Sequence, residues 1–175
     1  MASTPERIIL ASASVARAEL LRAAGVDFAV EPAAIDEDWL KRDARRDGDS
    51  AIECAAALAA AKARCVSNRH PEALVIGADQ ILAIGTEWFD KPGDLAEASG
   101  QLRVLRGQTH SLATAVCVAK GGVSLWRATS EPEMTMRRFA PRSVRRGVSL
   151  PSIIGRSSML PGARSRRPLH RSTSC

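Results

Sequence analysis

The clearest pattern of apolar and polar positions lies in residues 74–92, which read LVIGADQILAIGTEWFDKP. The apolar run Leu74–Ile76 predicts a buried strand. The small residues at positions 77 and 78 would let the backbone approach a neighbouring element closely. We expect Asp79 to lie at the end of this strand and Lys91 to follow it after a turn.

Asp79 and Lys91 could meet across one pocket, where an acid and a lysine can hold a metal, activate water and neutralise a phosphate. A strand that ends in a capping aspartate, followed by a surface lysine, explains the same two residues without any function. The spacing alone leaves both interpretations open.

Apolar and polar positions elsewhere predict alternating strands and helices, followed by hairpins. Before residue 74 we expect strands at 8–11 and 26–30, helices at 16–24 and 50–67, and a loop or frayed helix at 41–49. After residue 92 we expect a helix at 93–105, strands at 111–119 and 123–128 joined at Gly121-Gly122, and a further strand at 133–139. This order describes an α/β domain with a mixed sheet.

The first strand and helix are joined by small polar residues that suit an anion. Ser14 has the side chain of a helix N-cap, and the free N–H groups of a helix N-terminus attract anions. Arg17, one turn into the helix, could add a charged contact. Ordinary capping serves equally well, so this feature alone does not decide between the two roles.

Two further groups of residues carry alternatives of the same kind. Ser50 and Glu53 fit a capping box at the start of the long helix. Lys62, late in that helix, either complements the helix dipole or contacts a phosphate. Residues 35–38, which include Glu37, form either a solvated acidic turn or part of a metal site.

The charge of the chain is unevenly distributed. The whole chain carries +6, but residues 139–175 hold eight of its 25 Lys and Arg residues and none of its 19 Asp and Glu residues. Residues 1–138 are therefore mildly acidic, at −2. We expect a nucleic-acid partner only through this basic tail, which is rich in Arg, Ser and Pro and shows no lasting helical or strand period.

Several classes of protein are excluded by what the sequence lacks. No apolar run reaches the length of a membrane span and the N-terminus makes a poor signal peptide, so we expect a cytoplasmic protein. The four cysteines show no C-x-x-C spacing and the three histidines are scattered, which argues against zinc. The motifs G-x-x-x-x-G-K-[ST], G-x-G-x-x-G, H-E-x-x-H and G-x-S-x-G are absent.

Six short blocks occur in a fixed order within residues 8–138. They read SASVARAELL at 12–21, IDE at 35–37, LAAAKA at 58–63, GADQ at 77–80, DKP at 90–92 and RGQTHSLAT at 106–114. Together they resemble the Maf family of nucleoside triphosphate pyrophosphatases. Chance would give any one block but hardly all six in sequence.

The resemblance implies a Maf/inosine-triphosphatase-like fold, a mixed sheet with flanking helices and a cleft between two lobes. It implies hydrolysis of a nucleoside triphosphate, modified or not, to a monophosphate and pyrophosphate in nucleotide-pool housekeeping. It also implies a divalent metal, Mg²⁺ or Mn²⁺, and a homodimer is a further expectation. A triphosphate carries about four negative charges, which cations must neutralise before attack.

Site residues follow from the matching positions. Asp79 would be the catalytic acid/base that aligns or deprotonates water, or a ligand of the metal, and Glu37 would assist in holding the metal. Substrate-binding positions would be Ser12, Ser14, Arg17, Lys62, Gln80 and Lys91. Gln80 also places the chain nearer the members of the family that act on methylated guanine nucleotides.

The chain departs from the family pattern in two places. Val15 and Ala16 stand where the family has Pro and a first Arg, so one cation is missing. The family's later helix, strand and hairpin do not appear after Phe139, which divides the chain into a Maf-like domain at 1–138 and an atypical tail at 139–175. A reading-frame shift explains this tail, and a divergent tail that binds acidic partners is the alternative. The alternative function is a crippled Maf-like protein that binds nucleotides or nucleic acid without turnover.

Overall fold

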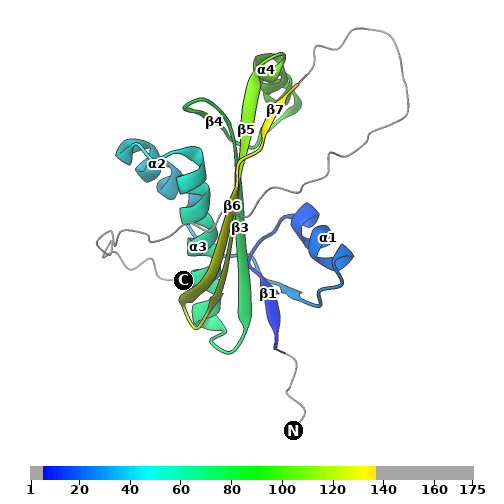
Figure 1. The fold of residues 1–175 in the computed structure, drawn as a ribbon, viewed down its shortest axis with the longest axis vertical. Coiled ribbons are helices and arrows are strands. Elements are labelled where there is room, and N and C mark those ends of the chain that lie inside the picture. Colours follow the sequence, from blue (N-terminus) through cyan, green and yellow to red (C-terminus); the bar gives the residue numbers. More distant parts are fainter. Residues whose placement is uncertain (1–5, 137–175) are drawn as a thin grey trace.

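A mixed β-sheet forms the centre of the fold in the computed structural model of this chain, which describes residues 6–136 (Figure 1). The described part covers nearly all of the predicted domain at 1–138. The predicted tail at 139–175 lies outside the described residues. The predicted α/β class with a mixed sheet is confirmed.

The elements alternate first and form hairpins later, as the sequence predicts. The helices are α1 (Val15–Ala23), α2 (Glu37–Asp47), α3 (Ala51–Arg69) and α4 (Leu95–Leu105). The strands are β1 (Ile8–Leu10), β2 (Ala29–Val30), β3 (Leu74–Ile84), β4 (Glu87–Phe89), β5 (Thr109–Lys120), β6 (Val123–Ser130) and β7 (Glu133–Thr135).

Strand β3 is the centre of the sheet, whose main path runs β2-β1-β3-β5-β6. β1 pairs in parallel with both β2 and β3, whereas β5 pairs antiparallel with β3 from Val75 to Ala83. β4 and β7 add to β3 and β5 at the far end of the sheet. Helices α2 and α3 lie on one side of the sheet, and α1 lies on the other (Figure 1).

The edge of β3 opposite β5 changes partner along its length. β1 pairs with this edge only from Leu74 to Ile76, and β4 pairs with it only from Leu82 to Ile84. Among the described strands, none pairs with this edge from Gly77 to Ile81. In open α/β sheets such a point, where neighbouring strands diverge, is a common place for a ligand.

Helix α3 packs against the sheet through small side chains. Five of its eleven buried residues are alanine, and seven of the eleven form the main core cluster with alternate residues of β3 and β5. Gly77 allows the closest approach, because a Cβ there would lie 2.3 Å from the carbonyl oxygen of Ala59 and 2.6 Å from the backbone nitrogen of Ala63. The predicted role of this glycine in close backbone contact is therefore confirmed.

The predicted helix caps are present. The Ser14 side chain accepts from the backbone N–H of Arg17, and Ser50 and Glu53 form a complete capping box. No helix within residues 6–136 is long and apolar enough to cross a membrane.

Some predicted boundaries are wrong. Asp79 lies in the middle of β3 rather than at its end, because the apolar alternation continues through Ile81 and Ala83, which pack toward α3. Lys62 lies in the middle of α3, too far from its C-terminus to complement the dipole there. The strand expected at 26–30 is reduced to β2.

The segment predicted as a loop or frayed helix at 41–49 is part of the regular helix α2. Its start is fixed by Asp36, whose Oδ1 accepts from the backbone N–H of Trp39 at 2.8 Å. It ends at Gly48, whose φ of 77° is the left-handed conformation that closes many helices. In the acidic turn expected at 35–38, Asp36 is therefore the N-cap, and Glu37 and Asp38 lie in the first turn of this helix.

Candidate active site

A buried lysine joins two carboxylates at the centre of the fold. Lys62 Nζ donates to Asp79 Oδ1 at 2.6 Å and to Glu37 Oε2 at 2.8 Å. The side chains of Lys62 and Asp79 are each only 8% exposed, whereas that of Glu37 is 43% exposed. Three of the predicted site residues are thus brought together from α3, β3 and α2, with Glu37 on the solvent side.

Local sequence explains how these residues meet. The small residues of α3 let the helix lie directly on β3 at Gly77, two positions before Asp79. Lys62 is next to Ala63, one of the residues at that close contact. The backbone of α3 at Lys62 is therefore close enough to β3 for the lysine side chain to reach Asp79. A buried charge is costly unless it is paired, and this lysine is paired twice.

The residues predicted around the first helix form a second group. Arg17 Nη1 donates to Ser12 Oγ at 3.0 Å, and the backbone N–H of Ser14 donates to the same oxygen at 3.2 Å. Ser12 itself is buried. The described residues show no hydrogen bond or ion pair that links this group to the Lys62 cluster.

The unpaired edge of β3 relates the two groups in space. Leu10, the last residue of β1, is paired with Ile76, three positions before Asp79. The loop from Ser12 to the start of α1 therefore leaves β1 at the level where β3 loses its partner. The two groups border the same interruption of the sheet.

In the described part of the chain, the other two predicted substrate-binding residues show no hydrogen bond or ion pair with the cluster. Gln80 is exposed, and its Nε2 donates to Thr114 Oγ1 on β5 at 2.8 Å. Lys91 is exposed and lies in the loop between β4 and α4. Since β4 pairs with β3 beyond the unpaired edge, the loop that carries Lys91 begins at the end of that edge opposite β1.

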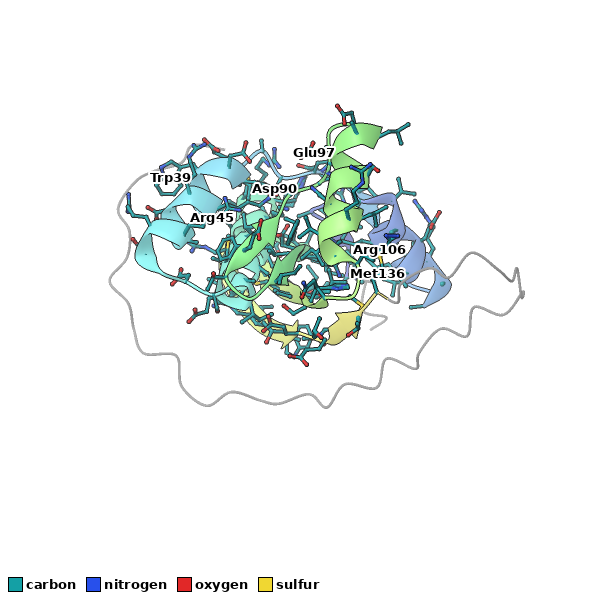
Figure 2. All side chains as sticks on the ribbon, turned by 90° about the horizontal axis from the view of Figure 1, so that it is seen from above. Trp39, Arg45, Asp90, Glu97, Arg106 and Met136 are labelled. Carbon is teal, nitrogen blue, oxygen red and sulfur yellow. The ribbon has the colours of Figure 1, made fainter. Side chains whose placement is uncertain are left out.

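Two residues that the sequence reasoning missed extend the charged cluster. Lys41 Nζ lies 2.5 Å from Asp90 Oδ1, and Arg45 Nη2 lies 3.7 Å from Asp90 Oδ2. Figure 2 shows Asp90 between α2, which carries Arg45, and α4. The only sequence signal was the position of Lys41 four residues after Glu37, which places both on one face of a helix once α2 is known.

The chemistry of the donors fits a hard divalent cation only in part. Glu37 and Asp79 offer carboxylate oxygens, the ligands that Mg²⁺ and Mn²⁺ prefer. Within residues 6–136 no group of three or more His, Cys, Asp and Glu residues could hold a metal ion. Mg²⁺ is commonly bound by one or two carboxylates together with substrate phosphates, and the two carboxylates here fit that arrangement.

Cys54 lies near the cluster but is not suited to nucleophilic chemistry. Burial, with a further contribution from the charge of Asp79, raises the pKa of its thiol to about 11. The thiolate is the reactive form of cysteine, and at neutral pH this residue is a protonated core side chain.

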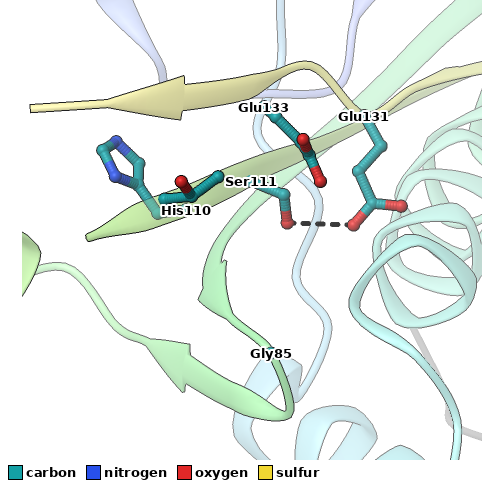
Figure 3. Close-up of a pocket in the computed structure, with 6 residues that line it drawn as sticks. Gly85, His110, Ser111, Glu131 and Glu133 are labelled. Carbon is teal, nitrogen blue, oxygen red and sulfur yellow. Dashed lines mark hydrogen bonds between the residues drawn. The ribbon is translucent and has the colours of Figure 1, made fainter.

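A separate pocket of about 360 Å³ lies at the end of the sheet where β4 and β7 are added (Figure 3). It is lined by Gly85, Thr109, His110, Ser111, Glu131 and Glu133. Ser111 Oγ donates to Glu131 Oε1 at 3.0 Å. None of the predicted site residues lines this pocket, and its acidic lining does not suit a triphosphate.

The fold is that of an α/β protein in which a buried charged cluster lies beside an interruption of the sheet. Residues 7–151 match the Maf-like protein family, and the chain belongs to this family. The predicted resemblance is confirmed.

Curated relatives agree with this assignment. A nucleoside triphosphate pyrophosphatase of Granulibacter bethesdensis is 48% identical over 77% of this chain and 68% of its own length. One of the same name from Rhodospirillum rubrum is 47% identical over 76% of this chain and 66% of its own length. A 7-methyl-GTP pyrophosphatase of Rhizobium etli is 40% identical over 82% of this chain and 72% of its own length. The chain thus spans about two thirds of the length of these relatives.

A solved structure of a HAM1 protein from Coxiella burnetii is similar with a TM-score of 0.48 and 16% identity. The similarity covers 73% of this chain and 71% of that one.

Proposed function

We propose that this protein hydrolyses a nucleoside triphosphate to a nucleoside monophosphate and pyrophosphate. The observation that carries the proposal is the buried Asp79–Lys62–Glu37 cluster beside the unpaired edge of β3, in a chain of the Maf-like family. The named relatives are nucleoside triphosphate pyrophosphatases, which agrees with this reaction. A cytoplasmic location and a homodimer remain predictions from the sequence.

In this proposal Asp79 acts on the attacking water. Its Oδ1 is bound to Lys62, so Oδ2 is left to accept a hydrogen bond from a water molecule and to orient it toward the α-phosphate. The burial of Asp79 limits competing water, which strengthens the electrostatic interactions within the site. The buried position of Asp79 and its pairing with Lys62 support this proposed role.

The cations of the site would bind the phosphates. The elements that carry Arg17 and Lys91 flank the two ends of the unpaired edge, and Lys62 lies between the carboxylates. Ser12 and Ser14 would line the pocket next to Arg17, and exposed Gln80 would contact the nucleotide. Cations that neutralise a triphosphate lower the charge barrier that otherwise repels an incoming oxygen.

Glu37 and Asp79 would hold a divalent metal, Mg²⁺ or Mn²⁺, together with phosphate oxygens of the substrate. When bound, such a metal supplies Lewis-acid polarisation of a phosphoryl oxygen and lowers the pKa of a bound water. Because Lys62 occupies both carboxylates in the free protein, we expect it to leave at least one of them when substrate and metal bind.

The test is the release of pyrophosphate from nucleoside triphosphates with and without added Mg²⁺ or Mn²⁺. The substrates should include UTP, TTP, CTP, GTP and 7-methyl-GTP, because the relatives include a 7-methyl-GTP pyrophosphatase. We expect metal-dependent release by the full chain and none by Asp79→Asn. Asparagine keeps an acceptor for Lys62, and Glu37 remains its second partner, so the variant should stay folded by circular dichroism. Undiminished turnover by a folded Asp79→Asn protein would remove Asp79 from the mechanism.

A further inference from the structure

Asp90, the residue before Lys91, is held by contacts from two helices. Its carboxylate accepts from Lys41 at 2.5 Å and lies 3.7 Å from the guanidinium of Arg45. Its backbone carbonyl accepts from Gln101 Nε2 of α4 at 2.9 Å. Side chain and backbone of this one residue are therefore fixed by α2 and α4 together.

Strand β4, which leads into this loop, is held by helix α2. Trp88 lies on β4, where it pairs with Ala83 of β3. The guanidinium of Arg45 stands 5.0 Å from the centroid of the Trp88 ring, a distance typical of a cation–π contact. Helix α2 thus contacts the loop on both sides of Phe89.

Helix α2 also carries part of the candidate active site. Lys41 follows Glu37 by one turn, and residues at this spacing share a helix face. Glu37 in turn contacts Lys62, the partner of Asp79. A single rigid helix therefore connects the buried cluster with the loop that carries Lys91.

Both members of the Lys41–Asp90 pair are charged at neutral pH. The hydrogen bond from Lys41, followed by the opposing effect of burial, leaves the pKa of Asp90 below its usual value. Burial alone would lower the pKa of Lys41, but the hydrogen bond and charge of Asp90, with the charges of Asp79 and Glu37, raise it. Lys41 therefore also interacts electrostatically with Asp79 and Glu37 of the cluster.

We propose that Asp90 is a positioning residue which, held by Lys41, sets where Lys91 lies relative to the phosphates of the substrate. The proposal rests on the proposed function and deepens it by assigning how the β4–α4 loop is aligned with the triphosphate. Asp90 is not assigned a contact with substrate, because its carboxylate oxygens are already directed to Lys41 and Arg45. Its effect reaches the ligand through Lys91.

A double-mutant cycle tests whether Asp90 acts through Lys91. The variants are Asp90→Asn, Lys91→Ala and both together, and the measurement is the binding of inorganic tripolyphosphate to the full chain by calorimetry. Half-exposed ion pairs contribute about 0.2–1 kcal/mol, so we expect Asp90→Asn to weaken binding up to about fivefold. In the Lys91→Ala background the same change should have no further effect, because the residue it positions is gone.

The Lys120–Glu6 pair provides a matched control, since its N–O distance is 2.6 Å and it joins β5 to the residues before β1. Glu6→Gln should leave tripolyphosphate binding unchanged. Hydrogen exchange gives a readout that needs no ligand: the amides of residues 88–94 should exchange faster in Asp90→Asn than in the unaltered protein, and not in Glu6→Gln.

Three results would overturn the inference. They are an Asp90→Asn effect that adds fully to that of Lys91→Ala, unchanged exchange of residues 88–94, and no tripolyphosphate binding by the unaltered chain. A different result would refute the proposed function alone: a non-additive cycle with faster exchange, in a chain that releases no pyrophosphate from any nucleotide.

Discussion

Gly77 is the residue whose absent side chain shapes the site most directly. Its hydrogen faces backbone atoms of α3, the O of Ala59 and the N of Ala63, and backbone atoms cannot rotate away as a side chain end can. Lys62 and Asp79 are each adjacent to this contact in their own element. The separation of α3 from β3, and with it the 2.6 Å ion pair, therefore depends on glycine at this position.

We expect Gly77→Ala to destabilise the protein by about 1–3 kcal/mol or more, because the added methyl group must push the helix from the strand. Urea unfolding measures the loss. The control is Gly100→Ala in α4, where nothing lies within 4 Å of the new Cβ and helix propensity should add about 0.5–1 kcal/mol of stability. Equal unfolding midpoints for Gly77→Ala and the unaltered protein would show that α3 does not depend on this contact.

Lys62 gives a second prediction at the scale of the residue. Lys62→Met removes the ammonium group that neutralises Glu37 and Asp79, so the free protein should bind Mn²⁺ more tightly than the unaltered chain. Spin resonance of free Mn²⁺ measures this without any turnover. Breaking a buried pair costs roughly 3–5 kcal/mol, and Mn²⁺ should recover part of that loss in a thermal melt.

Lys120→Met is the matched control for Mn²⁺ binding, since it removes a lysine paired with Glu6 far along the sheet. Its affinity for Mn²⁺ should equal that of the unaltered chain. The same affinity in Lys62→Met would show that Lys62 does not compete with a cation.

At the scale of elements, the sequence predicted those contacts that form between residues close together in the chain. The capping box at Ser50 and the N-cap at Ser14 were readable because their partners lie three residues away. The Lys41–Asp90 pair spans 49 residues, and no local pattern could reveal it.

The position of Asp79 was misjudged for a related reason. A charged residue within an apolar strand looks like a strand end until its partner is known. That partner, Lys62, lies on another element and makes the interior position tolerable. The family resemblance named Glu37, Lys62 and Asp79 among the site residues, but the ion pairs that join these three required the structure.

The link between α2 and the β4–α4 loop should depend on pH in a defined direction. The pKa of Asp90 is lowered from 3.8, so its pairing stabilises the folded state above that value and is lost as the pH falls through the lower folded value. The pKa of Lys41 is raised from 10.5, so the pairing persists in base to at least that pH.

Urea unfolding of the unaltered chain and Asp90→Asn should therefore differ by a constant amount, at most about 1 kcal/mol, between pH 5 and 9. The difference should disappear in acid below the ordinary value of 3.8. Asp27→Asn, which alters an exposed aspartate without an ion pair in the described part of the chain, is the control and should leave the free energy of unfolding at neutral pH nearly unchanged. A difference that grows in acid would contradict the pairing.

At the scale of the whole molecule, β6 lies at one end of the main strand path and exposes large apolar side chains. Leu125 is 57% exposed, Trp126 53% and Val123 62%. An edge strand with exposed apolar residues is prone to pair with another chain. If the protein forms the homodimer expected from its sequence, this strand is where we expect the contacts between copies.

We expect the protein to self-associate as its concentration rises, and the double variant Leu125→Thr, Trp126→Thr to do so less. Light scattering over a range of concentrations measures the change. Val15→Thr on α1 removes an equally exposed apolar residue, 69% exposed, and should have no effect. A monodisperse monomer at every concentration would contradict this prediction.

The change of partner along β3 has a consequence for motion. β1 and α1 attach to one half of the strand, β4 and α4 attach to the other, and β3 runs unbroken between them with β5 beside it. At the level of Asp79, β5 is also paired with β6, so any closing of one side toward the other must twist a three-stranded ribbon rather than swing about a flexible loop. Such a ribbon is stiff, so the width of the opening at Asp79 should change little between the empty and occupied states, and nucleotides would be sorted by whether they fit a gap of preset size.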